Sequence, residues 1–567
     1  MKPQELSIVV WALASLGLRI PDDSQLGTAL LRAVSQSSGY FEAQSVANLL
    51  WGFGRLAIME PPALLIDASL LSTLVRRASQ LATDFTPQGL ANAVWGSAQL
   101  RAEPTKVAQV VANADISLLA AEDVGVVCWS LGRLGLSDED LAQAPLQRAA
   151  ELAWSRELDW QALGRVDYAV RALGSTAGSG KAVSRIRSAL HRNARSAIEV
   201  VNAARGELND GAVAFLLSAW AGKKFPDLAL RGDLPAEATR VLLVDDTGVA
   251  VCQTLREHRA KVSRWRRFCQ GLREGVAWPS PRRSGGYSAA VVRLPATKAA
   301  LELALRAVAP LVEAGGTVWL YGARAEGAHT MAAAIKSPIF DTASLVVEHQ
   351  GAFSVAKARR SAAEAPACEM QDCEEWKELE LDGQQLQWRV FPGLFAGGAL
   401  DVMTAALLAV LPSPRGRALD FCCGSGTIAA ALLLRAPGMR VDLLDADALA
   451  LEAARSNVPA ARSFYLSDGF ASLPEQRCYD WIVSNPPVHL GLQPDLTVLC
   501  ELLATGPQRL RPGGFLWLVT QTYVPVGCLT TAASTVWTDG RFTVWRIAAK
   551  DTGDAPESEG ARAKKKK

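Results

Sequence analysis

The chain has 567 residues, of which 49% are hydrophobic and 20% charged, so it is long enough for three or four domains and too apolar to be mostly disordered. Its formal charge is only +2, so any binding to nucleic acid must come from a local basic patch. The ten cysteines form no Cys-x-x-Cys pair and only five histidines accompany them, which argues against a metal site. Free thiols in a reducing, intracellular compartment are favoured instead. No apolar run reaches the roughly 18 residues of a membrane-spanning helix.

Tryptophan is unusually frequent, with 16 Trp against 7 Tyr. Four similar frames, LSIVVWALASL, VANLLWGFGRL, LANAVWGSAQL and VGVVCWSLGRL, are centred on Trp11, Trp51, Trp95 and Trp129. A weaker copy has Tyr168 in the same position, and another possible copy surrounds Trp220. Apolar residues recur within each frame at i, i+3, i+4 and i+7, which is typical of an amphipathic helix. A period near 40 residues therefore predicts an α-helical repeat solenoid over residues 1–235.

These frames resemble the octotricopeptide and FAST-kinase-type helical repeats of organellar RNA-binding proteins, over residues 1–225. The resemblance implies an RNA-binding solenoid, although protein binding is equally open and each Trp can be simply a core residue between stacked helices. Residues 3–6 share the register of residues 87–90, so the chain begins inside a repeat and would leave an apolar solenoid end exposed. We therefore expect the natural protein to start further upstream, and we leave an organelle (chloroplast or mitochondrion) and the cytoplasm open as its location.

From about residue 236 the pattern changes to alternating strands and helices. Buried parallel strands are predicted at 240–245, 289–294 and 317–321, with a helix at 298–313, so residues 236–361 should form a doubly wound, Rossmann-like α/β domain. The first turn, at 245–248, lacks the Gly-x-Gly that lets a nucleotide approach the backbone, and we expect a degenerate fold without a cofactor.

Two charged segments lie on either side of residues 381–550. Residues 362–380 contain seven acidic residues and little apolar periodicity, so we expect an acidic linker there. The tail, residues 551–567, ends in four lysines and is expected to be disordered.

A basic run in the first α/β domain is a candidate RNA-binding helix. Its cations alternate with Trp265 and Phe268, and they are Arg256, Arg259, Lys261, Arg264, Arg266, Arg267 and Arg273. Such a helix can contact RNA phosphates in a salt-dependent way, and an ordinary solvated helix is the alternative. A second run can extend the surface into the repeats, with Lys181, Arg185, Arg187, Arg192 and Arg195.

The second α/β domain, residues 381–550, contains a strand at residues 417–421, which includes Asp420 and runs into a glycine-rich turn. Gly424 and Gly426 allow a ligand to approach the backbone at the start of a helix. The spacing Asp-x-x-x-Gly-x-Gly, with Ala429 where a dinucleotide fingerprint needs a third glycine, favours S-adenosylmethionine.

Two further carboxylates follow the next strands. Asp445 lies 19 residues after Gly426 and can accept both ribose hydroxyls, with a plain helix cap as the alternative. Asp468 follows a third short strand and is predicted to face the adenine amine, although an ordinary turn residue is almost equally consistent.

The fourth strand is followed by Asn485, Pro486 and Pro487, which are the predicted catalytic residues. Two successive prolines fix a rigid turn at the carboxyl end of the strand, where α/β sites lie. The amide oxygen of Asn485 and the carbonyl oxygen of Pro486 can both accept hydrogen bonds from one planar NH2 group. This predicts direct methyl transfer to an amine, with positioning supplying most of the acceleration and no metal.

Residues 238–550 resemble the bacterial ribosomal RNA small subunit methyltransferase C family. Besides the motifs above, the resemblance rests on further stretches in the family's order: Phe391–Phe395, Leu400–Thr404, Ser484–Gly491, Arg511–Gly514 and Gly540–Arg546. It implies a class I, S-adenosylmethionine-dependent methyltransferase that makes N2-methylguanine in small-subunit rRNA. It also implies that the preceding α/β domain is a methyltransferase fold without its cofactor site.

Two positions depart from the family pattern. Val488 stands where an aromatic ring usually stacks on the target base, a contact worth about 1–3 kcal/mol, so His489 and Tyr523 become candidates to supply a ring. Cys422-Cys423 fills a turn that is often Gly-Cys, and buried thiols are favoured there over a vicinal disulfide. A methyltransferase for protein glutamine or another amine, and a non-catalytic RNA-binding scaffold, remain alternative functions.

Overall fold

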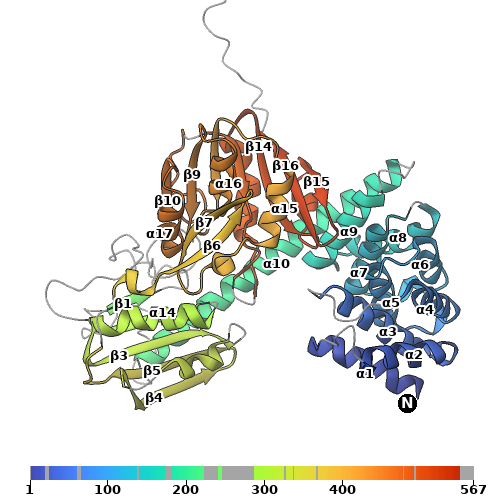
Figure 1. Ribbon diagram of the computed structural model, residues 1–567, viewed down its shortest axis with the longest axis horizontal. Helices are drawn as coiled ribbons and strands as arrows, with labels where there is room; N and C mark the ends of the chain where they lie inside the picture. Colours follow the sequence, from blue (N-terminus) through green and yellow to red (C-terminus); the bar gives the residue numbers. More distant parts are fainter. Residues whose placement is uncertain are drawn as a thin grey trace, which may run out of the picture. The chain divides into compact units, whose positions relative to one another are not determined.

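The computed structural model divides into two compact units (Figure 1). The first is Met1–Val200 together with Gln521–Ala533 and Thr538–Thr543, and the second is Val201–Thr520 with Ser534–Trp537 and Val544–Lys567. The structure describes residues 2–18, 25–59, 66–136, 139–173, 180–221, 241–244, 287–295, 297–324, 327–335, 338–365, 368–476, 478–490 and 493–549. Within these ranges no helix is both long enough and apolar enough to cross a membrane.

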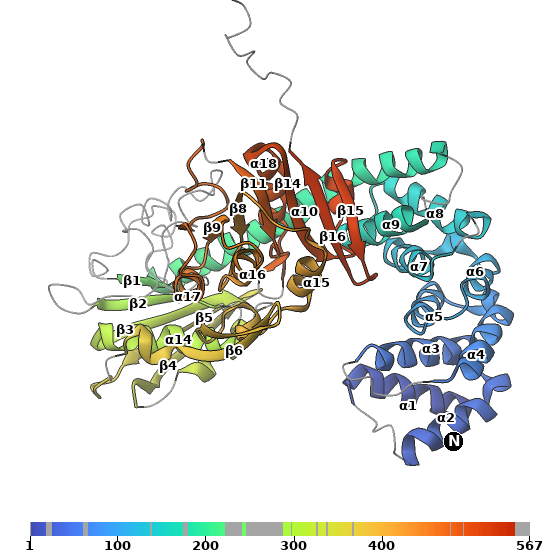
Figure 2. The ribbon, with the colours of Figure 1, turned by 45° about the horizontal axis from the view of Figure 1, so that its top comes forward.

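The first unit is built from pairs of helices, as the repeating frames predicted (Figure 2). Successive odd-numbered helices pack on one another, and they are α1 (Pro3–Leu16), α3 (Ala43–Ala57), α5 (Pro87–Gln99), α7 (Ala121–Leu134) and α9 (Trp160–Leu173). The even-numbered helices are α2 (Gln25–Gln36), α4 (Ala68–Gln80), α6 (Pro104–Ala112) and α8 (Glu139–Trp154). A long helix, α10 (Gly180–Ala221), follows.

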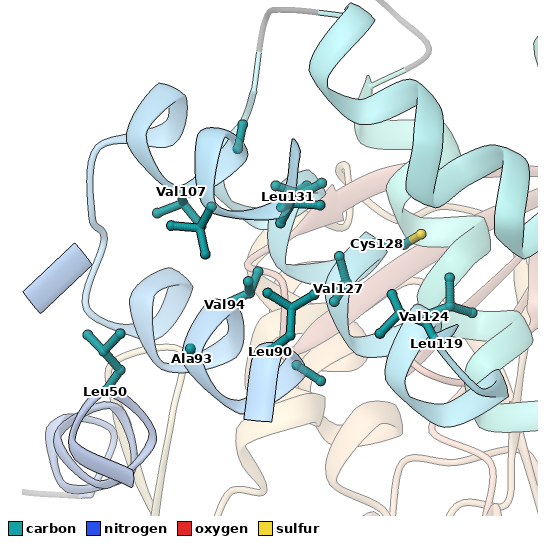
Figure 3. Packing of buried hydrophobic residues seen from close by; sticks show 14 of the residues in the cluster. Leu50, Leu90, Ala93, Val94, Val107, Leu119, Val124, Val127, Cys128 and Leu131 are labelled. Atoms are coloured by element: carbon teal, nitrogen blue, oxygen red, sulfur yellow. The ribbon is translucent and has the colours of Figure 1, made fainter. Parts of the chain in front are cut away.

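The core of this unit runs between the helices and consists of side chains such as Leu50, Val94, Val107 and Val127 (Figure 3). Small residues allow the close approach of the odd-numbered helices: a Cβ atom at Gly96 of α5 would overlap the backbone of Leu50 in α3.

The aromatic residues of the frames form contacts along this layer and are not uniformly buried. The rings of Trp51 and Trp95 lie 6.4 Å apart, and those of Trp129 and Tyr168 lie 6.5 Å apart. Trp11 is 46% exposed, whereas Trp129 is 8% exposed. The core interpretation therefore holds fully for Trp129 but not for Trp11.

The second unit begins with a five-stranded sheet in the order β1-β2-β3-β5-β4. Its strands are β1 (Val241–Val244), β2 (Tyr287–Arg293), β3 (Val312–Ala323), β4 (Phe340–Gln350) and β5 (Phe353–Arg360). The first three are parallel, and β5 is antiparallel to both β3 and β4. Helix α14 (Lys298–Val308) packs Leu301 and Leu305 against Val292 and Leu320 of the sheet.

This α/β layer agrees with the predicted strand–helix alternation. The predicted turn at 245–248 and the basic run with Arg264, Arg266 and Arg267 lie outside the described residues, as does the tail 551–567. A decayed cofactor fold therefore remains a proposal.

The prediction of an acidic linker over the whole of residues 362–380 is wrong for its second half. Residues Met370–Cys373 form a short 3-10 helix, and β6 (Glu375–Leu381) pairs antiparallel with β7 (Gln384–Val390). The charged residues of β6 occupy its exposed positions, while Leu379 and Leu381 are each 2% exposed. An acidic strand with one buried face was mistaken for a linker.

A seven-stranded sheet follows in the order β10-β9-β8-β11-β14-β16-β15. Its strands are β8 (Arg417–Phe421), β9 (Arg440–Asp445), β10 (Ser463–Leu466), β11 (Tyr479–Ser484), β14 (Leu510–Gln521), β15 (Ala533–Thr538) and β16 (Phe542–Ala548). The accompanying helices are α15 (Val402–Val410), α16 (Thr427–Arg435), α17 (Ala448–Asn457) and α18 (Thr497–Thr505).

Strands β10, β9, β8, β11 and β14 are all parallel. Phe421 pairs with both Leu444 and Ser484, and Ser484 also pairs with Leu518. The carboxyl ends of these strands therefore meet at one edge, which is where α/β proteins bind their ligands.

Candidate active site

The glycine-rich turn lies between β8 and α16 at this edge. Cys422, Gly424 and Gly426 all have left-handed backbone conformations, with φ of 58°, 54° and 94°. Apart from Gly424 itself and its two chain neighbours, no described residue has an atom within 4 Å of the position that a Cβ atom would take at Gly424, whereas a Cβ atom at Gly426 would press on Val458. Gly424 thus keeps its backbone open to a ligand, and Gly426 allows close packing below it.

Asp420, at the end of β8, is fully buried. One of its carboxylate oxygens accepts the backbone N–H of Ala429 at 2.9 Å, and the other, Oδ1, has no hydrogen-bond partner among the described residues. Burial raises the pKa of Asp420 to about 8. Such a carboxyl suits a cationic ligand group, because a positive charge would offset the cost of its burial.

Asp445, at the end of β9, links the strand to the glycine-rich turn. Its Oδ2 accepts the backbone N–H of Gly424 at 2.8 Å, and its Oδ1 accepts the N–H of Asp447 at 2.9 Å. Burial raises its pKa, and these backbone hydrogen bonds oppose the shift. The cap of the following helix is Asp447, which accepts the N–H groups of Leu449 and Ala450. Asp445 is therefore not the helix cap that was the alternative to a ribose ligand.

Asp468 follows β10, as predicted, and is half-buried just past the buried Ser467. Because β10 pairs with β9 and Leu466 faces Asp445 in register, Asp445 and Asp468 follow the ends of neighbouring strands. This order of Gly424, Asp445 and Asp468 along one sheet edge fits S-adenosylmethionine, whose amino acid, ribose and adenine groups need separate polar partners.

Residues that sequence reasoning missed brace the glycine-rich turn. Trp388, from β7, donates its indole N–H to Ser425 Oγ at 3.0 Å. Asn457, at the end of α17, donates to the carbonyl oxygens of Ser425 and Arg389, and it accepts the N–H of Arg389. The β6–β7 hairpin therefore supports the site as well as preceding it.

Asn485 lies immediately after β11, and its amide is held from one side. Its Nδ2 donates to Asp401 Oδ2 at 2.9 Å and to Thr404 Oγ1 at 3.1 Å. A carboxylate only accepts hydrogen bonds, so the nitrogen must face Asp401 and the amide oxygen must face away. Ser484 fixes the end of β11, because its buried hydroxyl donates to the carbonyl of Phe421 at 2.7 Å.

Asp401 is the N-cap of α15 and accepts the N–H groups of Met403 and Thr404 through the same oxygen that binds Asn485. Asp401 and Thr404 stood inside a stretch that carried the family resemblance, but their contact with Asn485 spans more than 80 positions of sequence. Asp401 can be read from the sequence as a helix cap, but its contact with the distant Asn-Pro-Pro turn cannot.

The substrate-side candidates differ in their surroundings. Val488 is only 5% exposed and belongs to the core, so it is not placed as a stacking surface. Pro486 is buried, Pro487 and His489 are exposed, and His489 starts the short strand β12 (His489–Leu490), which pairs with β13 (Gln493–Pro494).

Tyr523 lies in the first unit. Its ring contacts the Trp160 ring edge-on at a centroid distance of 5.7 Å, so the structure shows it as a packing residue.

The cysteines of the site are thiols. Cys422 and Cys423 are both free, and burial raises their pKa well above the usual value. Across the described part of the chain, no group of three His, Cys, Asp or Glu side chains is arranged to hold a metal ion.

Comparison with known proteins identifies the domain. Residues 385–544 match the family model described as "Methyltransferase small domain". The "Ribosomal RNA small subunit methyltransferase C" of Hahella chejuensis is 32% identical over 242 residues, covering 41% of this chain and 68% of that protein. The protein of the same name from Klebsiella pneumoniae is 36% identical over 154 residues, covering 26% of this chain and 44% of that protein.

The chain spans about half the length of several other relatives, such as the Salmonella typhi protein, of which it covers 52%. Among solved structures, the "T. Thermophilus 16S rRNA N2 G1207 methyltransferase (RsmC) in complex with AdoMet and Guanosine" has a TM-score of 0.45 and 22% identity, covering 58% of this chain and 93% of that one. Residues 385–544 thus form an S-adenosylmethionine-dependent methyltransferase domain, and the chain belongs to the ribosomal RNA small subunit methyltransferase C family.

Proposed function

We propose that this protein transfers a methyl group from S-adenosylmethionine to the exocyclic N2 of a guanine in small-subunit rRNA. The observation that carries the proposal is the orientation of Asn485: Asp401 and Thr404 hold its nitrogen, which leaves its oxygen to accept a hydrogen bond. The names of the relatives support rRNA as the substrate class.

The residues would act mainly by positioning. The Asn485 amide oxygen and the Pro486 carbonyl would accept the two N–H groups of a planar exocyclic amine and direct its lone pair outward. When bound, S-adenosylmethionine supplies a methyl group activated by its sulfonium. A strong base is not needed, because the amine proton can leave after the nitrogen has been methylated. Orientation alone can supply several kcal/mol of such a barrier.

The cofactor would lie along the carboxyl edge of the sheet. We assign the open backbone at Gly424 to its approach, with Gly426 packed beneath the turn. Asp445 is assigned to the ribose hydroxyls and Asp468 to the adenine amine. Asp420 would oppose the cationic amino acid end, either directly or through the turn, which suits its buried Oδ1, an atom without a hydrogen-bond partner in the described part of the chain.

RNA is the proposed partner, and helix α10 offers cations for its phosphates. The exposed residues of the second basic run are Arg185, Arg187, Arg192 and Arg195. The guanidinium of Arg192 lies 4.3 Å from the centre of the Trp154 ring, and this ring is itself 49% exposed. A cation stacked on an exposed ring suits single-stranded RNA, where phosphates and bases are both accessible.

The decisive experiment replaces Asn485 by Ala and uses Asn113→Ala, on the exposed end of α6, as a matched control. Small-subunit RNA is incubated with methyl-labelled cofactor, digested to nucleosides and analysed for N2-methylguanosine. We expect transfer to fall on the order of 10²-fold in the Asn485 variant and to persist in the control.

A parallel sample treated with ribonuclease before the reaction separates RNA from protein substrates. Label that survives ribonuclease would identify a protein amine as the acceptor, and unchanged transfer by Asn485→Ala would refute the mechanism.

A further inference from the structure

The last odd-numbered helix of the repeats, α9, packs on a segment from the far end of the chain. In α7, Gly125 stands four residues before the ring of its frame, and a Cβ atom there would lie 3.0 Å from Ala162 of α9. Gly164 holds the same position in α9, four residues before Tyr168, and a Cβ atom there would overlap the carbonyl group of Tyr523. The segment after β14 therefore takes the place that a following repeat helix would occupy.

This segment also completes the apolar core of the repeats. Cys528, in the short helix α19 (Val526–Leu529), is 3% exposed and belongs to the same buried cluster as Leu163 and Val166 of α9. Helical solenoids need their terminal apolar faces to be covered. Here the cover is Gln521–Ala533 of the same chain.

Polar side chains of α9 and α10 hold the backbone of this cover. His191 Nδ1 lies 2.6 Å from the carbonyl oxygen of Cys528. Arg171 is oriented by the buried Asp167 at 2.8 Å and donates to the carbonyl of Ala533 at 3.4 Å. Gly527 lies against this pair, and a Cβ atom there would overlap the Arg171 guanidinium and the Asp167 carboxylate unless these side chains shifted.

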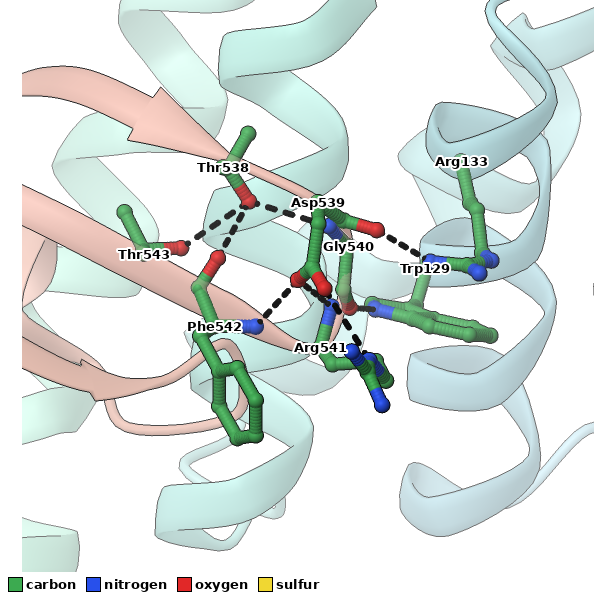
Figure 4. A network of polar contacts seen from close by, with 8 residues as sticks. All are labelled: Trp129, Arg133, Thr538, Asp539, Gly540, Arg541, Phe542 and Thr543. Carbon is green, nitrogen blue, oxygen red and sulfur yellow. Dashed lines mark hydrogen bonds and ion pairs between the residues drawn. The ribbon is translucent and has the colours of Figure 1, made fainter. Parts of the chain in front are cut away.

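A second segment, the turn between β15 and β16, contacts the frame residues of α7 (Figure 4). The indole N–H of Trp129 donates to the carbonyl oxygen of Gly540 at 2.9 Å, and Arg133 donates to the carbonyl oxygen of Asp539. Gly540 has a φ of 84°, which a residue with a side chain would adopt only with strain. The Trp–Arg pair of this frame thus recognises two successive peptide carbonyls.

We propose that α7, α9 and α10 form a docking surface for the chain's own segments 521–533 and 538–543. We further propose that this docking holds in place the two segments that follow β14 and join β15 to β16. Ser484 pairs with Leu518, so Asn485 and the chain beyond Gln521 leave neighbouring strands at the same edge. The occupant of this part of the solenoid is a polypeptide, because each polar contact described above from the helices to the two segments ends on a backbone carbonyl. The effect on methyl transfer rests on the proposed function, whereas the docking itself does not.

The test uses the full-length protein and two pairs of matched variants. Gly164→Ala would press on the carbonyl group of Tyr523, whereas Gly96→Ala, in α5, would press on the carbonyl group of Leu50 in α3, outside the docking surface. Trp129→Phe removes the indole N–H that binds Gly540. Trp95→Phe changes the ring at the same position of another frame, which packs on Trp51. Hydrogen exchange of peptides from 521–533 and 538–543 is measured for each variant.

We expect exchange in 521–533 to become about tenfold faster in Gly164→Ala, because the added Cβ atom displaces the carbonyl group of Tyr523. Exchange in 538–543 should rise by about the same factor in Trp129→Phe, since the lost hydrogen bond to Gly540 is worth about 1.4 kcal/mol. The control variants should leave both segments protected. S-adenosylmethionine affinity, measured by calorimetry, should stay unchanged while the KM for RNA rises in the two test variants.

Unchanged exchange in both test variants would overturn the docking, whatever the activity. Exchange that rises equally in the controls would also overturn it, because the segments would then respond only to the stability of the repeats. If Trp129→Phe weakened RNA binding in a filter assay without releasing 538–543, the surface would be an RNA site and the inference would be wrong. If the wild type methylated no rRNA, the proposed function would fail, and the exchange data would still decide the docking.

Discussion

The tether between Asp401 and Asn485 allows a sharp test of positioning. Replacing Asp401 by Ser keeps a side chain that can cap α15 but cannot reach Asn485 Nδ2, which now lies 2.9 Å from the carboxylate. The remaining partner, the Thr404 hydroxyl at 3.1 Å, can both donate and accept, so it does not distinguish the amide nitrogen from the oxygen. The amide then loses its preferred orientation.

The size of the effect follows from the hydrogen bond that the substitution removes. A hydrogen bond to a charged group is worth about 1.5–3 kcal/mol, which corresponds to a decrease of roughly 10- to 150-fold in single-turnover methyl transfer. Asp67→Ser is the matched control, because Asp67 caps α4 through the N–H of Leu70 and lies in the other unit. Asp67→Ser should lower the free energy of unfolding by about 1 kcal/mol or less. Asp401→Ser should lower it further, because it also loses the hydrogen bond from Asn485.

The refuting results are specific. Equal loss of transfer in the Asp67 and Asp401 variants would show that stability, and not orientation, limits the rate. Adding Asp401→Ser to Asn485→Ala should cost almost nothing further, since the tether acts only through the amide. Fully additive losses would mean that Asp401 acts independently of Asn485.

Three further predictions concern Asp420, the glycine-rich turn and the exposed arginines of α10. Burial raises the pKa of Asp420 to about 8, so the folded protein holds a proton that the unfolded chain releases near pH 4. The free energy of unfolding should therefore fall as the pH rises from about 4 to about 8, and urea unfolding of Asp420→Asn should depend less on pH. Gly424→Ala and Gly513→Ala both place a Cβ atom in open space at positive φ, so each should lose about 1–2 kcal/mol of stability, but calorimetry should show a fall in S-adenosylmethionine affinity, of roughly tenfold or more, only for Gly424. Replacing Arg185 and Arg192 by Ala should weaken RNA binding at low salt and reduce the slope of log affinity against log salt by about 1 for each phosphate that is no longer bound, as filter binding at several salt concentrations would show; an unchanged slope would remove α10 from the RNA surface.

The positions of the glycine-rich turn and of the Asn-Pro-Pro turn could be predicted from the sequence because their signals are local. Asn485 and Gly424 each belong to a short motif after a strand, and parallel strands bring their carboxyl ends together without further information. Asp401 was visible only as part of a resemblance, because its role depends on a hydrogen bond with a residue 84 positions away. The strand at 375–381 was missed for a different reason: its acidic residues point to solvent and hid the alternation of Leu379 and Leu381.

The tryptophan frames show how one pattern can serve different ends. Each frame specifies a helix of the repeat layer, and the rings of Trp51 and Trp95 use their position to pack on each other. Trp129 packs on Tyr168 in the same way, but its N–H also reaches a carbonyl at the opposite end of the chain, 411 positions away. Periodicity records the packing demand that all frames share, whereas the partner of a single polar atom depends on what tertiary structure brings to it. A repeating motif can therefore predict a solenoid without predicting which of its rings meet RNA and which meet the protein itself.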